Sequence, residues 1–331
     1  MPTPTLDRHH YVPMEERTGA SSVVYFTRDL SPEGLQKIYE RVKAPIQGKI
    51  AVKLHTGERH GPNIIPATWV KELFEKEIPD ATIVETNVYY EDSDRFTTED
   101  HLETLKVNGW TFSPVDIMDS EGTTTLPVKD GKWFTEMSVG KTLPTYDSLL
   151  VLTHFKGHVI GGFGGSNKNI GIGCADGTTG KKWIHKADYD DQWAVESDEL
   201  MERISESTKS VIDYFADHIS YINVLRNMSV SCDCEGVNAE PVVTPNVGIV
   251  ASLDILAVDQ ASVDLVYAMK EEDHKALVER IETRHGLRQL SYMKELGMGN
   301  DRYELIDIDN DDAVITPTDA VAHVVPFKLI K

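Results

Sequence analysis

The residues best suited to chemistry lie in one stretch, Leu149–Lys182, which reads "LLVLTHFKGHVIGGFGGSNKNIGIGCADGTTGKK". His154 and His158 bracket Lys156 there, and Lys168 follows in a glycine-dense segment. A histidine can act as a general acid or base near neutral pH, and a desolvated lysine can assist it or hold an anion. We therefore predict that these four side chains are catalytic residues in a site for a small anionic molecule.

The glycine-dense segment contains eight of the 23 glycines of the chain, between Gly161 and Gly180. Glycine permits positive φ and close backbone approach, so such a segment can present N–H groups to an anion. Neither the P-loop spacing nor the dinucleotide-binding spacing is present, so there is no ATP or NAD signature. We expect Gly164, Gly165 and Asn169 to contact the ligand or cofactor. The alternative is a tight crossover between a strand and a helix.

Cys232 and Cys234 form a C-x-C pair in a polar loop. In extended backbone both sulfurs face the same way, as a clamp for a soft metal requires. With Cys174 and His185 as further ligands, they predict a metal ion or iron–sulfur cluster with an open coordination position. The alternative is that these thiols are small buried side chains. Three cysteines cannot complete a four-cysteine cluster site alone.

These side chains need elements that position them, and the pattern of the chain predicts an α/β fold. Amphipathic segments with helical spacing lie between or after the apolar runs, at residues 31–43, 66–78, 197–219 and 255–270. This alternation predicts a mostly parallel sheet with helices on both faces, in a two-lobed arrangement. Four short apolar runs predict its buried strands: Lys49–His55, Ala81–Thr86, Asp147–Phe155 and Asn246–Asp254.

Polar side chains follow each of these predicted strands. Lys53 and His55 end the first strand, and Asn87 follows the second. His154 ends the third strand and Asp254 the fourth. Because ligands of open α/β sheets gather beyond the carboxyl ends of the strands, we expect these residues to converge there. Lys53 is then a predicted anion or cofactor contact, and His55 a predicted catalytic residue.

Length and charge restrict the classes of function. The chain has 331 residues and a net charge of −21, with 54 acidic against 33 basic residues, which disfavours nucleic acid and anionic membranes as partners. No apolar run approaches the ~20 residues of a membrane span, and the N-terminus lacks the apolar core of a secretory signal. We expect a cytoplasmic protein. Residues 1–30 are predicted to form a partly ordered arm and residues 31–331 a single two-lobed domain, with a lobe boundary near residue 150.

The chain resembles the family called domain of unknown function 362, whose members are often labelled uncharacterised iron–sulfur centre proteins. The resemblance runs from about Lys49 to Asp264. It rests on stretches that occur in the family's order: "VKLHTGE", "DRFTTEDHLETLKVNGW", "HFKGHVIGGFGGSNKNIGIGCADGTTGK", "CDCEG" and "GIVASLDILAVDQASVDLV".

The chain departs from the family pattern in one segment. Many relatives carry a ferredoxin-like insert with two C-x2-C-x2-C-x3-C-P runs after the glycine-dense block, whereas residues 181–218 of this chain contain no cysteine. The chain is therefore similar to the family core without its electron-transfer module, which would make that module a separate partner protein. In overall α/β arrangement the core is also similar to lactate racemase-like proteins. The resemblance implies family positions at His154, Lys156, His158, Lys168, Asn169, Cys174, His185, Cys232, Cys234, Asp254 and Asp259.

The prediction that follows is an enzyme that binds a small anionic substrate, with a metal or redox role for the cysteines. Racemase, isomerase, redox and lyase chemistry would all fit. The alternatives are a non-catalytic carrier of a metal or cofactor, with exposed cysteines, and a purely structural relative with buried, inert cysteines. For Asp254 and Asp259 we favour a helix cap and a buried hydrogen-bonding carboxylate over catalysis. Oligomeric state is left open.

Overall fold

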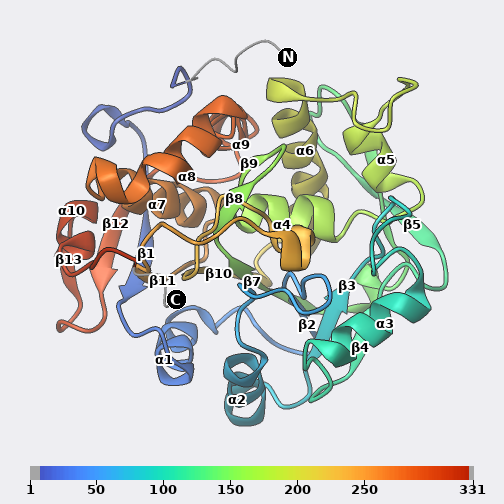
Figure 1. Cartoon of the computed structure of the whole chain (residues 1–331), viewed down its shortest axis with the longest axis horizontal. Helices are drawn as coiled ribbons and strands as arrows, with labels where there is room; N and C mark the ends of the chain where they lie inside the picture. The colour runs from blue at the N-terminus through green and yellow to red at the C-terminus, as the bar shows by residue number, and fades with distance from the viewer. Residues whose placement is uncertain (1–7, 328–331) are drawn as a thin grey trace.

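The computed structural model describes residues 8–327, in which one large sheet carries helices on both faces (Figure 1). The strands are β1 (Ser21–Thr27), β2 (Ile50–Lys53), β3 (Thr82–Glu85), β4 (Val115–Ile117), β5 (Thr123–Pro127), β6 (Glu136–Gly140), β7 (Ser148–His154), β8 (Lys156–His158), β9 (Gly162–Gly164), β10 (Ile219–Leu225), β11 (Gly248–Ser252), β12 (Arg302–Asp307) and β13 (Ala313–Ile315). The helices are α1 (Pro32–Val42), α2 (Ala67–Glu77), α3 (Thr98–Val107), α4 (Ser166–Gly173), α5 (Gly180–His185), α6 (Ser197–Phe215), α7 (Ile255–Ala268), α8 (Glu271–Thr283), α9 (Arg288–Glu295) and α10 (Pro317–Val321), with short 3-10 turns at Met14–Glu16, Leu143–Thr145 and Asp233–Asn238.

The large sheet has nine strands in the order β13-β12-β1-β11-β10-β7-β2-β3-β4. β2, β3, β4, β7 and β10 run parallel to one another, and β1 runs parallel to β12. β11 is antiparallel to both of its neighbours, and β13 is antiparallel to β12. The predicted α/β class with a mostly parallel sheet is confirmed.

The direction of β11 corrects one prediction about the site. Because β11 runs against β10, its carboxyl end points to the opposite edge of the sheet from the ends of β2, β3 and β7. Asp254 follows β11 and therefore does not converge with Lys53 and His154. Instead it caps α7, since its Oδ1 accepts a hydrogen bond from the Ala257 amide at 2.9 Å.

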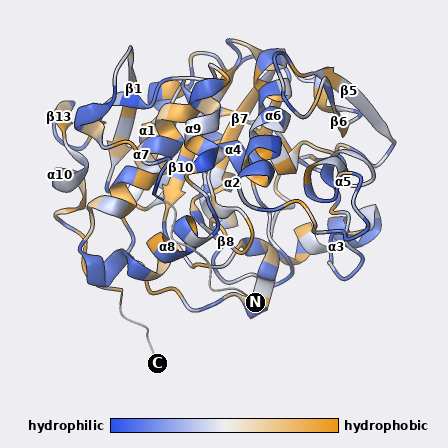
Figure 2. Ribbon diagram, turned by 90° about the horizontal axis from the view of Figure 1, so that it is seen from above, coloured by the Kyte–Doolittle hydropathy of each residue, from blue (hydrophilic) through white to orange (hydrophobic). Residues whose placement is uncertain are grey.

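Two apolar layers hold the helices against the sheet. Side chains alternate along β7, so Leu149 and Val151 pack on one face with α4, α6 and α7, while Leu150 and Leu152 pack on the other with α1 and α2. Figure 2 shows the hydrophobic residues concentrated in the middle of the molecule, on β10 for example, and hydrophilic residues on α3 at its margin. The prediction of helices on both faces is confirmed.

The elements that flank the site begin and end close to where the sequence predicts them. Ser31 caps α1, with Pro32 at the first helical position. α6 ends at Phe215, four residues earlier than predicted, because the chain turns there into β10. Residues 21–27, placed in the N-terminal arm by the sequence analysis, form β1 inside the sheet, since their burial alternates as in a strand.

Strands from both sides of residue 150 alternate in this one sheet, with β2 beside β7 and β1 beside β11. The lobe boundary near residue 150 and the two-lobed shape stay predictions. Within residues 8–327, no helix combines the length and the apolar character that crossing a bilayer requires.

Candidate functional site

A cavity of about 570 Å³ opens beyond the carboxyl ends of β2, β3 and β7, within the range of roughly 300–1,000 Å³ typical of ligand pockets. Most of the residues that the sequence singles out line it. His154 and Cys174 do not. The predicted residues in its lining are Lys53, His55, Lys156, His158, Gly164, Gly165, Lys168, Asn169, His185, Cys232 and Cys234.

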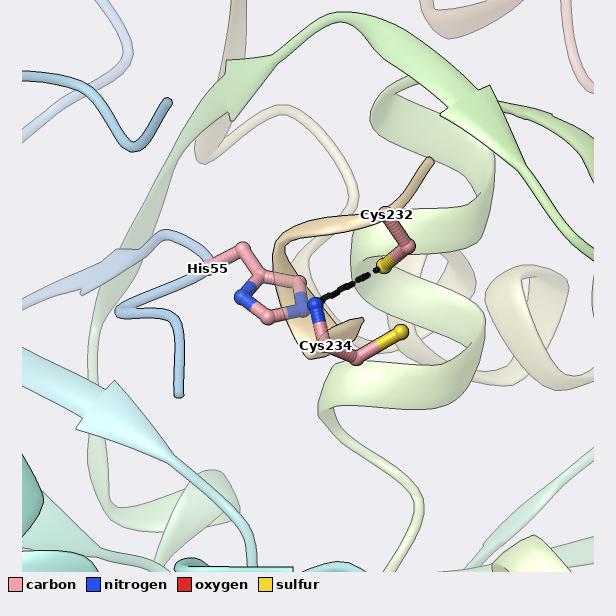
Figure 3. A group of neighbouring side chains, drawn as sticks. All are labelled: His55, Cys232 and Cys234. Carbon is pink, nitrogen blue, oxygen red and sulfur yellow. Dashed lines mark hydrogen bonds between the residues drawn. The ribbon is translucent and has the colours of Figure 1, made fainter. Parts of the chain in front are cut away.

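Three side chains in this cavity form a metal-donor group. His55, Cys232 and Cys234 each offer one ligand atom, and these atoms lie within 4.8 Å of one another. The Cys232 sulfur is 3.7 Å from His55 Nε2, and the ring faces the loop that carries both sulfurs (Figure 3). Two thiolates on one tetrahedral ion lie about 3.8 Å apart, so the group needs only a small contraction to bind one. His158 Nε2 lies 3.9 Å from the Cys234 sulfur, beside this group.

The protonation of these donors suits metal binding. Burial lowers the pKa of His55, and burial together with the Lys168 charge lowers the pKa of His158 to about 4, so both rings are neutral at pH 7. Burial would raise the pKa of the Cys232 thiol, but its hydrogen bond with Cys234 and the nearby histidines lower this pKa well below the usual value. That same hydrogen bond, followed by burial, raises the pKa of Cys234. A thiol with a lowered pKa and a neutral imidazole therefore meet in the cavity.

Asp233 lies between the two cysteines and fixes their loop through contacts with His154 and Lys156. Its Oδ2 is 2.8 Å from His154 Nδ1 and 3.2 Å from Lys156 Nζ, and all three side chains are buried. His154 Nε2 also lies 2.6 Å from the Arg226 carbonyl oxygen, so both ring nitrogens face acceptors and neither faces the cavity. His154 therefore holds Asp233 and lies outside the cavity lining, while its predicted catalytic role stays a prediction.

Cys174 does not join Cys232 and Cys234. It ends α4 and is fully buried in the apolar core, where burial raises the pKa of its thiol to about 12. A neutral thiol without contact to the cavity is a packing residue. His185, the other predicted ligand, lines the cavity but lies outside the group of three donors and packs its ring against Tyr89 at 5.8 Å.

Lys53 is buried against a carboxylate that the sequence analysis did not identify. Its Nζ lies 2.6 Å from Glu85 Oε2, and Thr56 donates its backbone N–H and its hydroxyl to Glu85 Oε1. The Lys53 stem passes directly over Gly173, where a Cβ would lie 2.1 Å from Lys53 Cε. Lys53 thus forms a neutralised part of the cavity floor.

The Lys53–Glu85 pair predicts a pH-dependent stability. Burial would raise the pKa of Glu85, but the Lys53 charge outweighs it and holds this pKa well below 4.5. The pair therefore stabilises the fold above pH ~4.5, and the contribution is lost as pH falls below that value. We expect Glu85→Gln to lower the free energy of unfolding by about 3–5 kcal/mol at pH 7, and by progressively less from pH 4.5 to pH 3. Urea unfolding at several pH values measures this.

The exposed Glu91→Gln is the control for that measurement and should change little at any pH. A difference between wild type and Glu85→Gln that stays constant down to pH 3 would contradict the assignment of the ion pair.

Two lysines in the cavity have no carboxylate partner among the residues that the structure describes. Lys168 is buried, burial lowers its pKa, and within residues 8–327 its Nζ has no hydrogen bond or ion pair. Lys181 donates to two neutral oxygens, the Thr86 hydroxyl at 2.6 Å and the Asn87 carbonyl at 2.5 Å. Buried charges are usually paired, so this arrangement favours an anionic ligand.

The glycine-dense block folds into β8, β9 and α4, and its glycines serve close packing as well as the cavity. A Cβ on Gly165 would lie 2.5 Å from Asp259 Oδ1. Asp259 accepts the Ser166 and Asn167 amides at 2.7 and 2.9 Å, which confirms its expected role as a buried hydrogen-bonding carboxylate. Asn169 Nδ2 donates to the Thr153 hydroxyl at 2.9 Å and so joins α4 to β7.

Several residues of the cavity were missed by the sequence analysis. Lys181 stands in the glycine-dense block, and Arg95 in the stretch "DRFTTED", so the resemblance already drew attention to both segments. Arg95 lines the cavity, and its Nε lies 2.8 Å from Oε1 of the buried Glu58 behind it. Tyr89, Tyr90 and Trp193 carried no signal, because aromatic residues in loops are common.

The fold and the site together define an α/β protein with two cysteines and a histidine grouped at the carboxyl edge of its sheet. The sequence model of the family described as Domain of unknown function (DUF362) matches residues 50–264. The match covers more than half of the chain, and the chain belongs to this family. No curated protein matches it.

Two solved structures are similar to the chain. One is a lactate racemase apoprotein from Thermoanaerobacterium thermosaccharolyticum, with 13% identity, a TM-score of 0.35, and coverage of 92% of this chain and 88% of that one. The other is a Thermotoga maritima protein solved by the Northeast Structural Genomics Consortium, with 15% identity, a TM-score of 0.36 and coverage of 58% of this chain. The aligned part spans 49% of the Thermotoga maritima chain, about half of its length.

Proposed function

We propose that this protein is a metal-dependent enzyme that acts by proton transfer on a small anionic substrate. One observation carries the proposal: His55, Cys232 and Cys234 converge within 4.8 Å in the same cavity as a buried Lys168 that has no ion-pair partner in residues 8–327. A carrier that passes a metal to a partner would expose its cysteines. Here Cys232 is buried and Cys234 half-buried.

The donor set fits a single metal ion. Two cysteines and one histidine leave a fourth position for water or substrate, as in catalytic zinc sites. The set does not fit a four-cysteine cluster, because Cys174 is packed in the core away from the cavity. A bound ion would act as a Lewis acid toward an oxygen of the substrate.

The residues of this chain supply the remaining functions. Lys168 attracts the anionic group of the substrate and is close enough to His158 for its charge to lower the pKa of that ring. His158 is neutral at pH 7 and lines the cavity, so it can accept a proton from the substrate. Burial strengthens both interactions, since charges interact more strongly where water is excluded.

The test uses full-length protein purified without a metal-binding tag and loaded with cobalt(II). We expect one cobalt per chain with thiolate charge-transfer bands, and a change in the visible spectrum when acetate is added. Lys168→Met should keep the cobalt but weaken acetate binding by about 10- to 100-fold, the size expected for a lost charged contact. Lys182→Met, an exposed lysine outside the cavity, is the matched control and should bind as wild type.

Other outcomes of this experiment would contradict particular parts of the proposal. Stoichiometric cobalt whose spectrum ignores acetate would indicate a metal carrier. Failure to bind cobalt, zinc, nickel or iron would overturn the metal site. Equal acetate affinity in wild type and Lys168→Met would remove Lys168 from the anion site.

A further inference from the structure

One end of the cavity is built from aromatic rings that the proposed function does not use. Tyr89 and Tyr90 come from the loop after β3, while His185 ends α5 and Trp193 follows it. The Trp193 ring lies 5.0 Å from Tyr89, 5.6 Å from Tyr90 and 5.2 Å from His185, all at inclined angles. We call these four residues the aromatic wall.

His185 in this wall has an unmet hydrogen-bonding requirement. Its side chain is buried, yet Nδ1 has no hydrogen-bond partner in the part of the chain that the structure describes. A buried polar atom without a partner costs free energy. Nδ1 itself has almost no accessible surface, so His185 offers a ligand its ring and not this atom.

Trp193 keeps a large part of its surface exposed. It is 38% exposed although it lines the cavity, and the loop that carries it is tied to the wall by a hydrogen bond from the Tyr89 hydroxyl to the Gln192 carbonyl. Large apolar surface left open in a cavity favours an apolar ligand. The apolar side chains of Val88, Ile160 and Ile172 continue this surface along the lining.

The aromatic wall adjoins the cationic part of the cavity. Lys168, His158 and Lys181 line the same cavity as His185. Burial lowers the pKa of His185, and these three groups lower it further. A ligand that reaches from Lys168 to the wall therefore needs an anionic group at one end and a flat apolar body at the other.

We propose that the substrate is an aromatic carboxylate: its carboxylate lies by Lys168 and its ring packs on the aromatic wall. This inference rests on the proposed function and names its substrate class. Aromatic rings prefer inclined or offset contacts with other rings, which the geometry of the wall offers.

Calorimetry on the zinc-loaded full chain tests the ring. The probes are acetate, cyclohexanecarboxylate and benzoate. We expect benzoate to bind up to about 10-fold more tightly than cyclohexanecarboxylate, which has the same charge and similar size but no π face. Trp193→Leu should abolish this preference and leave acetate binding unchanged. Tyr189→Leu, an exposed aromatic residue of the same loop that does not line the cavity, should keep the preference.

His185→Phe is a second control, because it keeps a flat ring in the wall and removes both nitrogens. We expect it to keep the preference for benzoate. Equal binding of benzoate and cyclohexanecarboxylate would overturn the inference and leave the anion site standing. If acetate also fails to bind, the proposed function falls with it.

Discussion

Replacing Cys232 with alanine is expected to empty the metal site. Wild-type protein should contain about one metal ion per chain, and Cys232→Ala less than about 0.1 after dialysis against a weak chelator. Cys232 contributes one ligand atom of the donor group, and its sulfur lies 3.7 Å from His55 Nε2. Since loss of groups that merely orient a ligand costs 10- to 100-fold in metal affinity, loss of this ligand should cost at least about 100-fold. Elemental analysis gives the stoichiometry.

Cys174→Ala provides a matched control, because it removes a sulfur that is buried in the core outside the cavity. We expect it to keep its metal and to lose stability by about 1–2 kcal/mol through the small void it leaves. If Cys174→Ala loses the metal and Cys232→Ala keeps it, the donor group assigned here is wrong. This pair of variants also decides between the ligand set found in the structure and the one predicted from the sequence.

The second large effect is expected from Asp233→Asn. The change leaves His154 and Lys156 buried without their shared carboxylate, which lies 2.8 and 3.2 Å from them. Breaking a buried ion pair in this way costs about 3–5 kcal/mol. Because Asp233 also fixes the loop between the cysteines, metal affinity should fall by about 10- to 100-fold. Urea unfolding of the metal-free protein measures the first effect, and competition with a chromophoric chelator the second.

A remote ion pair separates the two effects of Asp233→Asn. Asp264 is buried and holds Arg17, 2.6 Å away, outside the cavity. Asp264→Asn should destabilise the fold by a similar amount and leave metal affinity unchanged. Equal metal affinity in both variants would show that Asp233 supports the fold alone.

The sequence predicted the layers of this fold and most of the cavity because both follow local rules. Buried strands are runs of apolar residues, their carboxyl ends define an edge, and the polar residues at that edge are visible in the sequence. This logic placed Lys53, His55 and Lys156 in one cavity. It failed for Asp254, because strand direction depends on the path of the whole chain: β11 returns antiparallel beside β10.

Roles within the cavity depended on partners that are distant in the sequence. Lys53 and Glu85 are 32 residues apart, and His154 and Asp233 are 79 apart, so the sequence did not show that these charges are neutralised. Cys174 looked like a third sulfur because of its place in the glycine-dense block, but the turn of α4 carries it into the core. Side-chain direction at the end of a helix is a tertiary property.

The metal donors come from distant parts of the sequence, and this separation determines when the site can form during folding. His55 and Cys232 are 177 residues apart in the chain, and they meet only when β2, β7 and β10 are joined in the sheet. A contact of such high sequence separation forms late in folding, because a long loop must first be closed. During synthesis, His55 therefore has no cysteine partner until the loop with Cys232 and Cys234 has left the ribosome. Metal uptake by this donor group would therefore be a final step of biogenesis, one that reports a finished fold.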